Sequence, residues 1–268
     1  MANEKLVRKI RVGTINKKKD LIGADLRGAN LSGAILEGFY LMRAKLTNAI
    51  LAGAHLEGAH LSGAILEGAD LKGAHLFEAI LTEANLSGAI LEGAHLIGAI
   101  LRGAILRGAD LKGAHLGGAQ LGGAHLEGAH LSGAIMTGAN LAAAKLSEAD
   151  LNGAVLEEAD LRDASLWRVK LRDASLKGAN LSGAILEGAD LKGAIVSTMQ
   201  LAKASNLMDV TMPDGKASLD KIKQWGLNNH NSQKSGVKFG SFFQGASFHV
   251  VDIHTRSKSL PLACPAST

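Results

Sequence analysis

With 268 residues, only 3 % of them aromatic and 33 of them glycine, the chain does not have the composition of an ordinary globular core. The same composition suits a repeat array, in which small residues let backbones stack closely. The net charge of +4 comes from basic ends, residues 1–20 and 205–268, around a slightly acidic middle. One cysteine, Cys264, excludes an intrachain disulfide framework, and no apolar run is long enough to cross a membrane, so we expect a cytoplasmic protein.

Residues 1–20 are predicted to form a short helical cap. Leu6, Val7 and Ile10 recur at helical spacing and would place one apolar face on the start of the array that follows. A stacked repeat exposes backbone edges at its ends, and these edges invite aggregation unless a cap covers them.

A five-residue repeat fills residues 21–204. Leucine stands at nearly every fifth position from Leu21 to Leu201, and alanine forms a second such column from Ala24 to Ala204. Glycine usually follows two residues after each leucine. A period of five fits neither a continuous helix nor a continuous strand, but it fits short extended pieces joined by regular bends. In an extended piece of the form Ala–x–Leu–x–Gly, alanine and leucine point to one side, and glycine supplies the bend because it tolerates positive φ.

Four such pieces would close a right-handed square coil of 20 residues, with the leucine and alanine columns inside it. The array would then stack about nine coils, roughly 4.8 Å apart, through backbone hydrogen bonds. One unit buries too little apolar surface to be stable alone, so the stack should fold together with its neighbours. The predicted core includes Leu26, Leu56, Leu76, Leu96, Leu116, Ala74 and Ala94.

The units Ala24-Asp25-Leu26-Arg27-Gly28 and Ala29-Asn30-Leu31-Ser32-Gly33 resemble those of pentapeptide-repeat proteins. The resemblance covers about two thirds of the chain and implies an all-β fold, a right-handed quadrilateral β-helix, in agreement with the coil described above. The family favours Asp or Asn before the central leucine, whereas this chain often has Ile or His there. Pentapeptide-repeat proteins are not generally enzymes. Their known roles include regulatory scaffolds and DNA mimics that protect DNA gyrase.

Three residues interrupt the alanine column, namely Phe39, Val169 and, where the repeat ends, Met199. Phe39 and Val169 place larger side chains in small slots, and we expect each to displace its neighbours and bulge its coil locally. Trp167 and Arg168 also depart from the repeat. An exposed recognition edge at these two residues is the alternative to simple local repacking.

Four histidines recur at intervals of one coil, which places His55, His75, His95 and His115 above one another on an outer face. A metal-binding stripe is one interpretation of this column. Zinc, however, needs three or four ligands that converge at about 2 Å, and rings in a parallel column should lie side by side. We therefore expect a structural stack and no metal site.

Apolar side chains gather beside the histidine column. Phe77 and Ile97 should point outward next to two of its members, and Ile80 and Ile100 should lie one coil apart on the adjoining face. A contiguous apolar patch indicates an interaction surface, although an isoleucine ladder that merely shields the backbone is the alternative. The predicted partner surface consists of His75, Phe77, Ile80, His95, Ile97, Ile100 and Trp167.

After Ala204 the repeat ends, and residues 205–268 are predicted to form a small C-terminal cap or extension. Pro213-Asp214-Gly215 is typical of a turn. A short helix over 218–226 and a hairpin over 239–253 would follow it, and the last residues should form a loose tail.

These features predict a non-catalytic scaffold that presents a rigid face to a protein partner or to a second copy of the chain. The alternative is a DNA mimic that binds or protects DNA gyrase, but a duplex about 43 Å long would carry roughly 25 negative charges, far more than this array. The basic ends contain no known nucleic-acid motif, so we expect neither a nucleic-acid nor a membrane partner. Walker loops, nucleophile elbows and cysteine pairs are missing, and we expect no catalytic residue and no cofactor.

Overall fold

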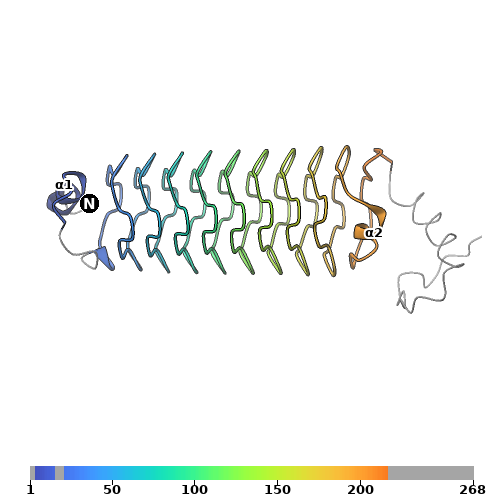
Figure 1. Cartoon of the computed structure of the whole chain (residues 1–268), viewed down its shortest axis with the longest axis horizontal. Helices are drawn as coiled ribbons and strands as arrows, with labels where there is room; N and C mark the ends of the chain where they lie inside the picture. The colour runs from blue at the N-terminus through green and yellow to red at the C-terminus, as the bar shows by residue number, and fades with distance from the viewer. Residues whose placement is uncertain (1–3, 16–20, 217–268) are drawn as a thin grey trace, which may run out of the picture. The chain divides into compact units, whose positions relative to one another are not determined.

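The computed structural model describes residues 4–15 and 21–216, which all lie within one compact unit, residues 1–220. The repeat forms a continuous stack of coils (Figure 1). Two helices accompany it, α1 at Glu4–Arg11 and α2 at Thr198–Leu201, and no helix in the described ranges is long and apolar enough to cross a membrane. The helix expected over 218–226 and the hairpin expected over 239–253 lie outside the described residues.

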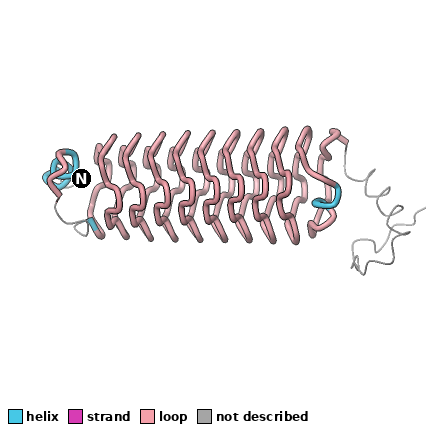
Figure 2. The backbone as a smooth tube through the Cα atoms, in the orientation of Figure 1, coloured by secondary structure: helices cyan, strands magenta, loops and turns pink. Residues whose placement is uncertain are grey.

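One turn of the coil takes 20 residues along almost the whole array. The residue before each leucine forms a parallel bridge with the residue 20 positions later, from Asp25 and Lys45 to Ser175 and Ile195. The Lys45 N–H donates to the Ala24 carbonyl at 2.9 Å, and the Lys45 carbonyl accepts from the Leu26 N–H at 2.8 Å. These extended pieces are single bridged residues rather than longer strands, so the array is drawn as turns and loops (Figure 2).

The leucine and alanine columns fill the interior of the coil, because two residues that are two apart in an extended piece point to the same side. The members named from the sequence are all buried, with at most 1 % of each residue exposed: Leu26, Leu56, Leu76, Leu96, Leu116, Ala74 and Ala94. The residues between these two columns point outward. Any binding site on the sides of the array must therefore be built from the outward residues.

Each corner of the coil is a turn in which the residue two after leucine has positive φ. At Gly28, for example, φ is +65°, and the Ala29 N–H donates back to the Leu26 carbonyl at 3.0 Å. This is the backbone that glycine adopts without steric cost. The array nevertheless has other residues in this conformation, namely Arg43, Asn48, Glu78, Glu83, Ala143, Glu148, Glu158, Asp163, Arg168 and Asp173.

Most of these strained corner residues are followed, one coil later, by a glycine. A Cβ built on Gly98 would lie 3.4 Å from Cγ of Glu78, and one on Gly103 would lie 3.7 Å from Cγ of Glu83. The side chain of a strained corner thus leans over the next corner, where the missing side chain of glycine leaves room for it. This arrangement links residues 20 apart in the sequence.

Replacing Glu83 with glycine is expected to stabilise the protein by about 1 kcal/mol. The residue is exposed and has φ of +56°, a conformation that carries a steric penalty of about 1–2 kcal/mol for any residue with a Cβ, part of which the greater entropy of unfolded glycine offsets. Urea unfolding followed by circular dichroism measures the change. The matched control is Thr82→Gly at the preceding residue, whose φ is not positive, and it should destabilise the protein by about 0.5–1 kcal/mol.

The bulges expected at Phe39 and Val169 are wrong. Val169 is completely buried, yet its carbonyl accepts from the Asp190 N–H at 2.9 Å, in the same register as the rest of the array. Phe39 is half-buried against the core, and its carbonyl accepts from the His60 N–H at 2.8 Å. Val169 fits because the neighbours in its column, one coil before and after, are the small residues Ala149 and Ala189.

The register changes by one residue at the C-terminal end of the array. Bridges there join Ile185 to Asn206, 21 positions apart, and helix α2 lies in the longer segment. Ser197 caps α2 by accepting from the Gln200 N–H at 3.2 Å. In a regular coil that N–H would donate to the Ala179 carbonyl; here the side-chain amide of Gln200 donates to this carbonyl instead, at 2.8 Å. A side chain therefore replaces the backbone donor at this position of the array.

At the other end, helix α1 supplies the apolar residues that the sequence indicated. Ile10 belongs to the core cluster and is only 4 % exposed, and Leu6 and Val7 pack against that cluster. The charged side chains between them remain exposed, which gives α1 one apolar and one polar face.

Candidate functional site

The four histidines stack along one outer face, and we call this the histidine face: the column His55, His75, His95 and His115, with the residues two positions after each, Glu57, Phe77, Ile97 and Gly117. Successive histidines are bridged through their backbones. Their ring centroids lie 4.7, 5.2 and 5.1 Å apart, and the first two pairs of rings are nearly parallel. The stacking predicted from the 20-residue spacing is present.

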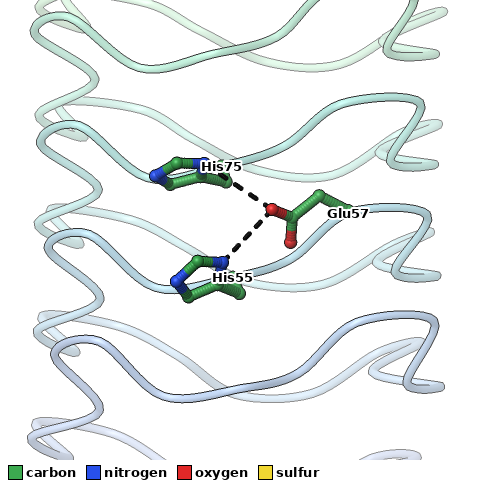
Figure 3. A group of neighbouring side chains, drawn as sticks. All are labelled: His55, Glu57 and His75. Atoms are coloured by element: carbon green, nitrogen blue, oxygen red, sulfur yellow. Dashed lines mark hydrogen bonds and ion pairs between the residues drawn. The ribbon is translucent and has the colours of Figure 1, made fainter.

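The expectation that these rings only lie side by side is wrong at the first two rungs. Nδ1 of His55 and Nδ1 of His75 both face Oε1 of Glu57, at 3.3 and 3.6 Å (Figure 3). The reason is that Glu57 follows His55 by two residues on the same face, so its side chain reaches the gap between two stacked rings. The other carboxylate oxygen, Oε2, is buried and has no hydrogen-bond partner among the described residues.

The 20-residue spacing places Glu57 beside the histidine column, but it does not show that the Glu57 side chain turns toward two of the rings. The signal that could have indicated this contact is a His-Leu-Glu segment with another histidine one coil later. The later rungs lack a carboxylate, since the residues two after His75, His95 and His115 are Phe, Ile and Gly.

The structure brings six of the seven residues of the predicted partner surface together on two consecutive coils. Phe77 and Ile97 are 47 % and 42 % exposed, and their segments are joined by the Glu78 N–H, which donates to the Ile97 carbonyl at 3.0 Å. The other four form two bridged pairs, His75 with His95 and Ile80 with Ile100. His75, Ile80 and Ile100 are half-buried, and His95 is exposed.

Trp167 does not belong with these six. It lies 90 residues after Phe77, which is four and a half coils of 20 residues, and so it faces the opposite side of the array. The guanidinium carbon of Arg168 stands 4.5 Å from the centre of the Trp167 ring, a cation–π contact. The tryptophan is half-buried rather than exposed, and the side chain of Arg168 lies over its ring.

The other three faces carry pairs of opposite charges. Arg162 donates to Asp160 at 2.6 Å, and this hydrogen bond holds the pKa of the Asp160 carboxyl below its usual range. Lys72 lies 2.8 Å from Glu92 one coil later, and hydrogen bonding to this carboxylate raises the pKa of the lysine. The histidine face, in contrast, has no lysine or arginine. The same holds when this side of the array is followed over the neighbouring coils, from position 35 to position 157, all of which the structure describes.

Comparison with known proteins agrees with this architecture. The family model for pentapeptide repeats matches the chain in eight copies, over residues 18–39, 40–76, 79–118, 114–153 and 159–197. None of the curated proteins compared with the chain matches it.

Solved structures of pentapeptide-repeat proteins match as well. HetL from the cyanobacterium Nostoc sp. strain PCC 7120, a protein involved in the regulation of heterocyst differentiation, is 34 % identical with a TM-score of 0.62, and the match covers 81 % of this chain and 99 % of HetL. Trypsin-treated QnrB1, a plasmid-mediated fluoroquinolone resistance protein, is 17 % identical over 78 % of this chain and 93 % of its own, with a TM-score of 0.42. Such proteins form right-handed β-helices. On the match to the family model and to HetL, the chain belongs to the pentapeptide-repeat family.

Proposed function

We propose that the chain is a non-catalytic scaffold that binds a protein partner through the histidine face. The observation that carries this proposal is that Phe77 and Ile97 stand exposed on two consecutive coils of the face without lysine or arginine. Half-buried Ile80 and Ile100 lie next to them on the adjoining face. The centres of protein interfaces are depleted in charged residues and enriched in aromatic ones, and exposed Phe77 and Ile97 on a face without lysine or arginine fit this pattern.

The stacked backbone suits this role because it fixes the outward residues before any partner arrives. Every coil on this part of the array is joined to the next by hydrogen bonds such as that from the Gly58 N–H to the Phe77 carbonyl, at 2.9 Å. A preorganised surface loses little conformational entropy on binding. Similarity to HetL, which is involved in a regulatory process, supports a regulatory interaction as the purpose of the scaffold.

The charge pattern argues against the alternative, a DNA mimic that binds or protects gyrase. A mimic needs a continuous acidic face, whereas several carboxylates here are paired with adjacent bases, as in Asp25 with Arg27 and Asp190 with Arg172. The histidine face has only a few acidic residues, and after Glu57 its next two coils present Phe77 and Ile97 in that position.

We also infer that residues 1–20 and 205–268 act as caps on an array of about nine coils. The apolar face of α1 supports this at one end, and Val210 and Met212, which are buried in the core cluster, support it at the other. Capped ends would leave the sides of the array as its binding surface, in a cytoplasmic protein.

Replacing Phe77 or Ile97 with serine is expected to lower the affinity for the partner at least tenfold, because buried apolar anchors contribute about 2 kcal/mol or more to an interface. The matched control is Ile90→Ser: Ile90 is 41 % exposed, almost the same as Ile97, but it lies on a different face. Affinity capture from extracts of the native host, with quantitative mass spectrometry, identifies proteins retained by the native chain and by Ile90→Ser but lost with both other variants.

Light scattering of the purified native chain and the three variants tests whether a second copy is the partner. A dimer lost in Phe77→Ser and Ile97→Ser would assign the face to self-association. If neither variant changes capture or oligomeric state, while circular dichroism shows that both are folded, the proposed surface is wrong.

A further inference from the structure

We propose that His55, Glu57 and His75 form a binding site for a divalent transition-metal ion such as Zn²⁺. The site lies on the histidine face but does not depend on the protein partner proposed above. It joins two successive coils, because His55 and Glu57 come from one coil and His75 comes from the next (Figure 3).

Two of the three separations between the ligand atoms are close to those of a tetrahedral site. At metal–ligand distances of about 2.0–2.1 Å, two ligands of a tetrahedral ion are about 3.4 Å apart. Oε1 of Glu57 lies 3.3 Å from Nδ1 of His55 and 3.6 Å from Nδ1 of His75, and all three ligand atoms lie within 4.8 Å of one another. Both rings are only half-buried, so small rotations of these side chains are enough to close the site around an ion.

The donor set selects the kind of ion. Two imidazole nitrogens and one carboxylate oxygen are typical ligands of Zn²⁺ and neighbouring late transition metals, and three protein ligands leave a fourth position for water. Ca²⁺ and Mg²⁺ require several oxygen ligands, which this group does not supply.

The charge of Glu57 also favours a cation. Its Oε2 is buried without a hydrogen-bond partner among the described residues, and the histidine face offers it no lysine or arginine. Several carboxylates on the other faces of the array are paired with such bases, as in Lys72 with Glu92. A bound divalent ion would supply the positive charge that the neighbouring side chains do not provide.

A second His-Leu-Glu segment in the same array shows what the site would be without its third ligand. His125 and Glu127 approach each other at 3.5 Å, but one coil after His125 the chain has Lys145 instead of histidine. Arg107 contacts Nδ1 of His125 at 3.0 Å and Glu127 at 3.3 Å, and Lys145 contacts Nε2 of His125 at 3.4 Å. Two cationic side chains already occupy this pair, so we expect no metal there.

The test is a titration of the full, tag-free chain, freed of metal with a chelator, with Zn²⁺ by isothermal titration calorimetry and with Co²⁺ by absorption spectroscopy. The native chain should bind one Zn²⁺ at this site, and Co²⁺ should give the intense visible bands of a four-coordinate ion. Glu57→Gln and His75→Asn should each weaken binding at least about tenfold. Glu127→Gln and His95→Asn are the matched controls and should bind like the native chain.

Thermal unfolding gives a second measurement, because an ion that joins two coils stabilises the folded state by mass action. Zn²⁺ should raise the midpoint of the native chain and of Glu127→Gln, but not that of Glu57→Gln. The assignment is overturned if the native chain shows no saturable binding, if Glu57→Gln binds as tightly as the native chain, or if His95→Asn loses as much affinity as His75→Asn. Circular dichroism without metal verifies that each variant is folded.

Discussion

Leu96→Ala is expected to lower the free energy of unfolding by about 2–5 kcal/mol. Leu96 is 1 % exposed and stands in the leucine column between Leu76 and Leu116, one coil before and one coil after it. Removing its side chain leaves a cavity that the neighbours cannot easily fill. The backbone hydrogen bonds of Leu96 to the next coil, such as the one to the His115 carbonyl at 2.7 Å, fix the distance between coils. The loss should therefore lie in the upper part of this range.

Chemical unfolding followed by circular dichroism measures this loss, with the slope of the transition compared between variants to detect any change in cooperativity. The control is Ile97→Ala at the very next residue, which is 42 % exposed and should change stability by no more than about 0.5 kcal/mol. Equal effects of the two substitutions would contradict the inward orientation of the leucine column.

The second large effect is expected from Ala94→Leu, which should destabilise the protein by about 1–3 kcal/mol. Ala94 is fully buried, and its column neighbours Ala74 and Ala114 are also fully buried alanines. A leucine side chain has no free space in this column, so it must either adopt a strained rotamer or push the coils apart. Val169 shows that one medium-sized side chain is accommodated between alanines, and leucine is larger still.

The same substitution at an outward position provides the control. Ala52 follows Leu51 and lies half-buried on an outer face, so Ala52→Leu should be nearly neutral, within about 0.5 kcal/mol. Thermal and urea unfolding of the two variants, prepared in parallel, give the comparison. If Ala94→Leu is as stable as Ala52→Leu, the alanine column is not the tightly packed layer that its burial indicates.

The interior of this protein was predictable because a five-residue period leaves few geometric solutions. Leu26 and Ala74 point inward for the same reason at every repeat, and the 20-residue turn then determines which outward residues share a face. The stack of His55 on His75 follows from that count alone. The same count places Trp167 on the side of the array opposite Phe77, because the two residues are four and a half coils apart. Trp167 was therefore wrongly included in the predicted partner surface.

Other features could not be read from the repeat because they depend on how particular side chains turn. The approach of two histidines to Glu57 depends on side-chain torsions that the repeat does not specify. The replacement of a backbone donor by the Gln200 amide depends on the extra residue at α2. The coil is regular at Val169, where a bulge was expected. The space for its side chain depends on the column neighbours one coil away rather than on the sequence neighbours.

The register of one coil per 20 residues also determines how the array can change in length. Adding four pentapeptides lengthens it by one coil, about 4.8 Å, and leaves every later residue on its original face. Adding one pentapeptide keeps the core intact but rotates all later residues by a quarter turn. If the insertion falls between Glu83 and Gly103, these two residues no longer lie above one another. Growth by whole coils therefore preserves surfaces, whereas growth by single units preserves only the fold and creates new combinations of outward residues.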